Sequence, residues 1–125
     1  MPEETRSAAE ARGREAEARV AARLEAEGWR VLARRQRAGR GGPAGEIDLI
    51  AEREGLLAFI EVKRRARLSE AALTLAPAQQ ARLLAGAEAW LAAHPGYGAA
   101  GVRFDLVLVD AAGRMRRIAD AFRLE

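Results

Sequence analysis

The chain has 125 residues, a length typical of one domain, and half of its residues are hydrophobic. It contains no cysteine, which excludes disulfide scaffolds, zinc sites built on thiolates and cysteine nucleophiles. The formal net charge is +3, and no apolar run approaches the roughly 20 residues of a membrane helix. We expect a soluble, cytoplasmic protein with no membrane partner.

A first helix is predicted over residues 3–27, which combine high helix propensity with alternating Arg and Glu, and Gly28 would end it. Its apolar stripe is weak. Glu17 projects onto this stripe, because Val20 and Leu24 lie three and seven residues later. An acid on a buried face is unusual. Glu17 is therefore either functional or a boundary residue paired with one of the nearby arginines.

Residues 46–65, EIDLIAEREGLLAFIEVKRR, have the pattern of two strands joined by a tight turn. Glu54 and Gly55 suit a two-residue hairpin turn. Counting outward from this turn places Asp48 opposite Glu61. Directly opposed side chains have Cβ atoms roughly 5 Å apart, so two carboxylates there repel each other unless a cation lies between them. A divalent metal is the obvious cation.

Lys63 follows Glu61 by two residues, so strand alternation points both side chains to one face. It is the only lysine among 21 basic residues. Lysine carries a compact charge whose pKa shifts readily, and arginine does not replace it at a reacting centre. The hairpin thus brings carboxylates and an ammonium group together. The alternative is an edge strand whose charges only prevent aggregation.

Arginines flank this hairpin on both sides. They are Arg35, Arg37 and Arg40 before it and Arg64 and Arg65 after it. Guanidinium groups suit bidentate contacts with phosphate, so these flanks favour a polyanionic partner. The alternative is a solvated basic surface without a ligand.

The remaining elements complete an α/β pattern. A strand is predicted over residues 29–36, a helix from Pro77 to His94, a strand over residues 102–110 and a short strand over residues 115–118. The order helix, three strands, helix, two strands predicts a mixed β-sheet flanked by α-helices.

The sequence resembles the UPF0102, or YraN-like, family over residues 10–122. The features that carry the resemblance are Gly13 with Glu17, Gly28-Trp29, GEIDLIA from Gly45, FIEVKRR from Phe59 and RFDLVLVD from Arg103. That family is similar to the restriction-endonuclease-like superfamily and to archaeal Holliday-junction resolvases. The resemblance implies a single resolvase-like domain spanning residues 1–125.

The resemblance also implies roles for the hairpin residues. In the PD-(D/E)XK signature of these nucleases, Asp48 is the first acid, Glu61 the second acid and Lys63 the lysine. Glu17 matches a helix acid that joins the metal shell. These acids would hold Mg²⁺ or Mn²⁺, which activates water and stabilises the developing charge, while Lys63 orients or deprotonates that water and binds the scissile phosphate.

A glutamine in the following helix commonly assists such enzymes, and here it is Gln80 or its neighbour Gln79. The chain departs from the family pattern at Ala16, where Gly is usual, and at Arg35, where Asn is common. It also has AQQAR where many members have a Lys-Gln pair. None of these changes removes an acid or the lysine.

The implied function is Mg²⁺-dependent endonuclease activity on DNA, in branched or single-stranded structures, by an enzyme that forms a symmetric homodimer. Two alternatives stand beside it. One is a non-catalytic nucleic-acid-binding protein that keeps the nuclease fold, and the other is an accessory scaffold that binds another protein.

Overall fold

A five-stranded mixed sheet forms the centre of the protein, and the computed structural model describes residues 6–37, 46–65, 68 and 75–122. The elements are α1 (Arg6–Ala26), β1 (Arg30–Arg37), β2 (Glu46–Arg53), β3 (Leu56–Arg64), α2 (Pro77–Ala93), β4 (Gly101–Val109) and β5 (Met115–Phe122). The strand order is β1-β2-β3-β4-β5, with β3 and β4 parallel and the other pairs antiparallel. The predicted α/β fold is confirmed, and the architecture is consistent with a resolvase-like domain.

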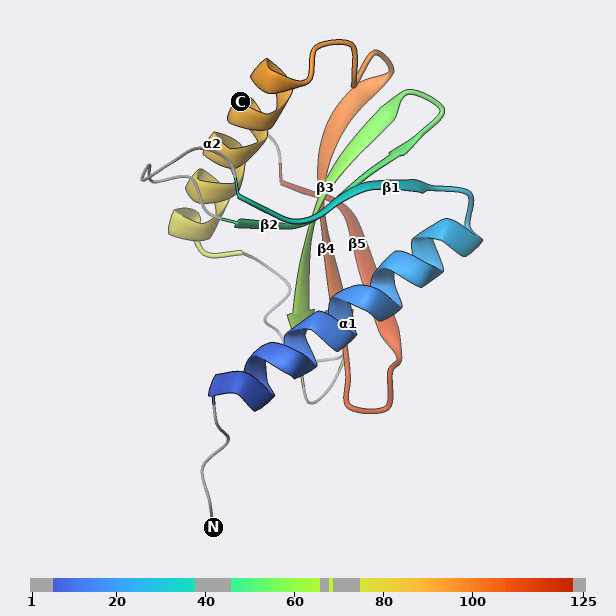
Figure 1. Cartoon of the computed structure of the whole chain (residues 1–125), viewed down its shortest axis with the longest axis vertical. Coiled ribbons are helices and arrows are strands. Elements are labelled where there is room, and N and C mark those ends of the chain that lie inside the picture. The colour runs from blue at the N-terminus through green and yellow to red at the C-terminus, as the bar shows by residue number, and fades with distance from the viewer. Residues whose placement is uncertain (1–5, 38–45, 66–67, 69–74, 123–125) are drawn as a thin grey trace.

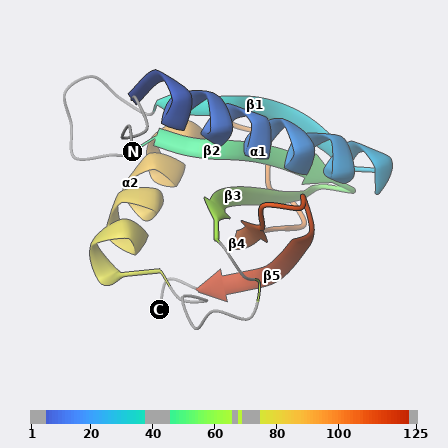
Figure 2. The same ribbon diagram turned by 90° about the horizontal axis from the view of Figure 1, so that it is seen from below.

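The two helices lie on opposite faces of the sheet (Figures 1 and 2). The α2 helix provides the crossover that a parallel pair such as β3 and β4 requires. Of these two described helices, neither is at once long and apolar enough to cross a membrane. Strand β5 extends to Phe122, four residues beyond the predicted end, because it pairs with β4 along most of its length.

The hairpin turn between β2 and β3 has the geometry that its sequence predicts. Glu54 and Gly55 both have positive φ, at 51° and 82°, which suits the right-handed twist of a hairpin. Arg53 pairs with Leu56, and the ladder then runs without a shift to the pair of Leu49 and Ile60. The predicted register of the hairpin is therefore confirmed from the turn as far as the pair of Leu49 and Ile60.

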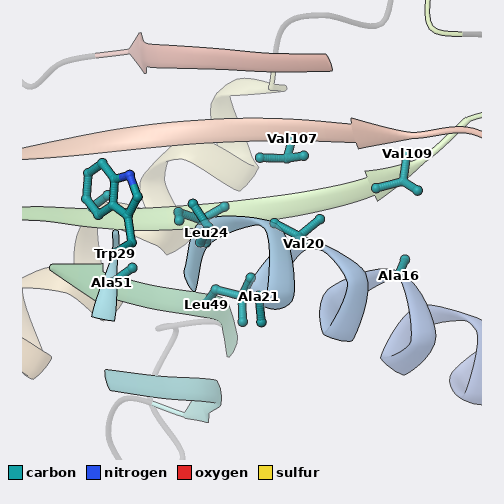
Figure 3. Packing of buried hydrophobic residues seen from close by; sticks show 11 residues of the cluster. Ala16, Val20, Ala21, Leu24, Trp29, Leu49, Ala51, Val107 and Val109 are labelled. Carbon is teal, nitrogen blue, oxygen red and sulfur yellow. The ribbon is translucent and has the colours of Figure 1, made fainter. Parts of the chain in front are cut away.

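The helix α1 packs on one face of the sheet through small and medium side chains. Those that enter the core are Ala16, Val20, Ala21 and Leu24 (Figure 3). They meet apolar residues of β2, β3 and β4, and Trp29 joins them with only 7% of its surface exposed. Small side chains allow the helix backbone to approach the sheet closely, so Glu17, which lies beside Ala16, is brought down to the sheet.

The opposite face holds a larger core under α2. Phe59 lies at its centre, 5.6 Å from Phe104 and 6.0 Å from Trp90 between ring centroids, in stacked and edge-on arrangements. Such aromatic pairs add roughly 1 kcal/mol each to the gain from burial. This core fixes α2 against β2 and β3, so Gln79 at the start of α2 has a defined position beside Glu46 and Glu61.

A buried ion cluster joins β4 to β5. Asp105 is 2% exposed and accepts hydrogen bonds from Arg103 Nε at 3.0 Å and from Arg117 Nη2 at 2.6 Å. The backbone N–H of Asp120 donates to it at 2.9 Å, and both guanidinium groups lie over the Trp29 ring. Because its carboxylate is fully paired, Asp105 has a structural role, and the sequence pattern did not predict its burial.

Candidate functional site

The candidate site lies where β2 separates from β3. The pairing of β2 with β3 ends at Leu49, whereas its pairing with β1 continues to Glu46. Beyond the last pair, Asp48 Oδ2 accepts a hydrogen bond of 2.8 Å from the backbone N–H of Val62. The Asp48 carboxylate thus accepts the hydrogen bond of a β3 backbone N–H at the point where the backbone of β2 no longer pairs with β3. The ladder ends one pair before the predicted pair of Asp48 and Glu61, but the two residues remain neighbours.

The alternation of β2 also breaks at Asp48. Leu49 packs on the α1 side of the sheet, and Ile50 packs on the α2 side. Regular alternation would put Ile47 on the same side as Leu49. Ile47 instead packs on the α2 side with Ile50. Asp48 therefore sits at the irregular position, and its carboxylate points along the sheet toward β3 at the bond to Val62.

Strand β1 is irregular at the same level. Arg35 lies between the residues of β1 that pair with Leu49 and Ile47, so it stands beside Asp48, and its φ is 50°. A left-handed conformation costs a non-glycine residue on the order of 1 kcal/mol and is kept only where the surroundings hold it. Here the arginine side chain is held by an acid of α1.

Glu17 is that acid, and its position confirms that it faces inward. The residue is 8% exposed, and Arg35 Nε donates a hydrogen bond of 2.6 Å to Glu17 Oε1. Gly13 lies one helical turn earlier, and a Cβ built there would lie 3.4 Å from the Arg35 guanidinium. A Cβ at position 13 would therefore be in van der Waals contact with the Arg35 guanidinium. Arg35, which was predicted to contact nucleic acid, instead pairs with Glu17 in this structure. Glu17 thus has the nearby arginine partner that its alternative interpretation, as a boundary residue, predicts.

Three carboxyl groups meet in a row with Asp48 in the middle. Glu61 and Glu17 both lie close enough to Asp48 to act on its pKa. Burial and the adjacent Glu61 raise the pKa of Asp48 to about 8, and the N–H of Val62 offsets part of this rise. Burial also raises the pKa of Glu17, against the hydrogen bond from Arg35. Asp48 and Glu17 therefore bind a proton more tightly than the same acids do in water.

Glu61 borders a cavity of about 260 Å³ that is also lined by Gln79 and Arg82 from α2. Lys63 is half-buried and lies on the same side of β3 as Glu61, two residues farther along the strand. The structure therefore brings Glu61 and Lys63 to the part of β3 that faces the start of α2.

The two glutamines at the start of α2 differ in their surroundings. Gln79 lines the cavity beside Glu61. Gln80 donates a hydrogen bond of 2.8 Å to the backbone oxygen of Leu75, in the segment that precedes α2. Gln79 is therefore the one that lies beside Glu61, although both side chains also bond to the start of the helix, Gln79 Oε1 accepting from the N–H of Ala76 at 3.4 Å and Gln80 donating to Leu75.

The arginines predicted to contact nucleic acid are distributed around this region. Arg64 is exposed at the end of β3, and Arg65 donates from its side chain to the backbone oxygen of Arg64 at 2.8 Å. Arg37 ends β1, and its backbone pairs with Glu46, but its side chain is outside the described part of the structure. Arg40 also lies outside the described residues.

The acids at this site have the chemistry of a binding site for a hard divalent cation, because Mg²⁺ and Mn²⁺ prefer carboxylate oxygens. In the described part of the chain, no three acid or histidine side chains already converge as a metal cage. The acids form a row instead, and Arg35 engages one end of it. Burial, with Glu61 beside it, raises the pKa of Asp48, and a cation bound there would offset both effects, so the donor set fits such a metal.

Comparisons with known proteins match nearly the whole domain. The profile of the uncharacterised protein family UPF0102 matches residues 16–109. A UPF0102 protein of Granulibacter bethesdensis is 57% identical over 113 residues, covering 90% of this chain and 69% of the relative. A UPF0102 protein of Rhodopseudomonas palustris strain HaA2 is 51% identical, covering 86% and 81%, and one of Paramagnetospirillum magneticum is 44% identical, covering 99% and 96%. This chain therefore belongs to the UPF0102 family, as its resemblance in sequence predicted.

Proposed function

We propose that the protein is a metal-dependent nuclease that acts in the cytoplasm on phosphodiester bonds of DNA, in branched or single-stranded structures. The observation that supports this proposal is the position of Asp48 between Glu17 and Glu61, with its pKa raised to about 8 by burial and by Glu61. Clustered acids with high proton affinity gain most from a cation that neutralises them. Lys63, on the strand that carries Glu61, supplies the second element of a hydrolytic site.

Hydrolysis requires the oxygen of a water molecule to bond to phosphorus while the bond from phosphorus to an ester oxygen breaks. Mg²⁺ or Mn²⁺ bound by the acids would provide a Lewis acid and lower the pKa of that water. Lys63 would hold a non-bridging phosphate oxygen and orient the water, a role supported by its position beyond Glu61 on the same side of β3. Gln79, in the cavity beside Glu61, can position the same phosphate through its amide.

The decisive experiment incubates the purified protein with a four-way junction, a flapped duplex and a single strand in Mn²⁺, in Mg²⁺ and in EDTA. We expect cleavage of at least one substrate in Mn²⁺ or Mg²⁺ and none in EDTA, scored on denaturing gels. The protein should also show a rise in melting temperature on addition of Mn²⁺. A protein that cleaves none of these substrates in either metal, and whose melting temperature ignores Mn²⁺, is not a nuclease of this kind.

The ion pair of Arg35 with Glu17 favours a second candidate, a nucleic-acid-binding protein that has lost catalysis. A guanidinium group 2.6 Å from a carboxylate oxygen already supplies part of the positive charge that a metal would bring. Such a protein would bind DNA equally well in EDTA and in Mn²⁺ and would leave every substrate intact.

Replacing Arg35 with Gln tests whether the Arg35 guanidinium competes with a metal for Glu17. If Arg35 competes with a metal for Glu17, the Arg35→Gln protein should bind Mn²⁺ about tenfold more tightly at pH 8, because a charged hydrogen bond of roughly 1.5 kcal/mol no longer has to be broken. Isothermal titration calorimetry measures this affinity. Arg34→Gln is the matched control, because Arg34 is the preceding residue and its guanidinium pairs with Glu25 at the surface, at 3.6 Å. Weaker Mn²⁺ binding by Arg35→Gln would instead show that Arg35 holds Glu17 in place for the metal.

A further inference from the structure

A second charged cavity lies on the α1 side of the molecule, at the ends of β3 and β4. It has a volume of about 210 Å³. Arg12 and Arg19 line it from α1, Arg64 lines it from the end of β3, and Asp110 and Gly113 line it from the turn between β4 and β5. We call this space the basic pocket. Three guanidinium groups from two separate elements therefore border one small cavity.

The turn at Gly113 is shaped to admit one of these guanidinium groups. Gly113 has a φ of 84°, and a Cβ built on it would overlap Nη1 of Arg19. Arg19 therefore lies folded over the turn, although its side chain also reaches Glu15 at 3.1 Å. Of the positions around the pocket, this is the one where a side chain larger than hydrogen would displace an arginine.

Both acids that line the basic pocket, Asp110 and Glu15, are paired with arginines. Asp110 accepts hydrogen bonds from the backbone N–H groups of Ala112 and Arg114 and from Arg114 Nε at 2.7 Å. Arg114 therefore balances Asp110, and Glu15 is balanced by Arg19. The lining of the pocket has three guanidinium groups, on Arg12, Arg19 and Arg64, against two carboxylates, and Arg114 from outside the lining pairs with one of these, so the net charge is positive and suits a phosphodiester.

The basic pocket is adjacent in the chain to the candidate active site. Arg64 follows Lys63, and Ala16, which also lines the pocket, precedes Glu17. Because neighbouring residues of a strand point to opposite faces, Lys63 and Arg64 lie on either side of the end of β3. A nucleic-acid strand with one phosphate at Lys63 would reach Arg64, Arg12 and Arg19 by passing around this strand end.

We propose that the basic pocket binds a backbone phosphate of the nucleic acid, next along the strand from the phosphate that is cleaved. This inference rests on the proposed nuclease function and gives the substrate a path, across the ends of β3 and β4 toward the first half of α1. Contacts of this type contribute affinity without base specificity, as expected for a protein that recognises DNA by structure.

Fluorescence anisotropy with a labelled four-way junction in EDTA tests the inference independently of cleavage. Arg19→Gln and Arg64→Gln should each weaken binding by about three- to tenfold and lower the slope of log K against log salt by about one. The matched control is Arg23→Gln. Arg23 lies on the same helix and makes the same type of exposed pair as Arg19, with Glu27 at 3.0 Å, but it does not line the basic pocket.

The outcomes distinguish this inference from the nuclease function. We expect Arg23→Gln to bind within about twofold of the wild type, because one unspecific surface charge adds little. If the pocket variants bind as the control does while the wild type binds and cleaves DNA, the basic pocket is not a phosphate site and the nuclease proposal stands. If the wild type binds neither the junction nor a flapped duplex nor a single strand even at low salt, both proposals are wrong. Circular dichroism melting of each variant confirms that it folds.

Discussion

The Asp48→Asn protein should lose its response to Mn²⁺ and, in the absence of metal, should be more stable than the wild type at pH 8. Asn keeps an oxygen that can accept the hydrogen bond from Val62, which Asp48 accepts at 2.8 Å. It removes the charge that a metal needs, so Mn²⁺ affinity should fall by at least about 100-fold and cleavage with it. Calorimetry and melting with and without Mn²⁺ measure both effects.

The gain in stability follows from the direction of the pKa shift. The pKa of Asp48 is about 8 in the folded protein, above its ordinary value of 3.8, so the folded state binds the proton more tightly than the unfolded state does. This contribution is present in full below pH 4 and is lost as the pH rises to about 8. Between pH 4 and pH 8 the free energy of unfolding of the wild type should therefore fall by on the order of a few kcal/mol. The Asp48→Asn protein should not show this loss.

Metal affinity should depend on pH for the same reason. Below pH 8 a metal has to displace the proton of Asp48, so the apparent affinity of the wild type for Mn²⁺ should rise with pH and level off near pH 8. Glu25→Gln, which removes an exposed acid of α1, is the control and should behave as the wild type does in every measurement. An unchanged Mn²⁺ response in Asp48→Asn would remove Asp48 from the metal site.

Local sequence rules predict the parts of the site that depend on one element. The turn at Glu54 and Gly55 sets the hairpin register, and this register makes Asp48 and Glu61 neighbours. Helical periodicity similarly predicts that Glu17 faces inward, which its 8% exposure confirms. The hairpin register follows from the turn and the helix face from the 3.6-residue period, and neither needs knowledge of the rest of the fold, whereas the break in strand alternation at Asp48 was not predicted.

The remaining features depend on contacts between elements that are distant in sequence. The ion pair of Arg35 with Glu17 joins residues 18 positions apart, and it requires a left-handed residue in β1 that no propensity predicts. The choice between Gln79 and Gln80 depends on how α2 is rotated over β3, because adjacent helix residues differ by about 100° in direction. The basic pocket similarly exists only because α1 crosses the ends of β3 and β4.

Replacing Lys63 should abolish cleavage while metal binding persists. We expect Lys63→Met to lower the cleavage rate by roughly 100- to 10,000-fold, the range that positioned acid, base and electrostatic groups contribute. Lys63 is half-buried at the end of β3, beyond Glu61 on the same side of the strand. Its removal leaves the three acids unchanged, so the rise in melting temperature with Mn²⁺ should remain.

The Lys63→Arg variant identifies what the ammonium group does. Arginine keeps the positive charge but spreads it over a planar fork, so it can still attract a phosphate and is poorly suited to orient or deprotonate water. If Lys63 acts on water, Lys63→Arg should bind the junction as the wild type does and still cleave at least about 100-fold more slowly. Full activity in Lys63→Arg would reduce the lysine to a phosphate-binding charge, and full activity in Lys63→Met would exclude it from the reaction. The sequence favours the first outcome, because a chain with 21 basic residues uses lysine at this position alone.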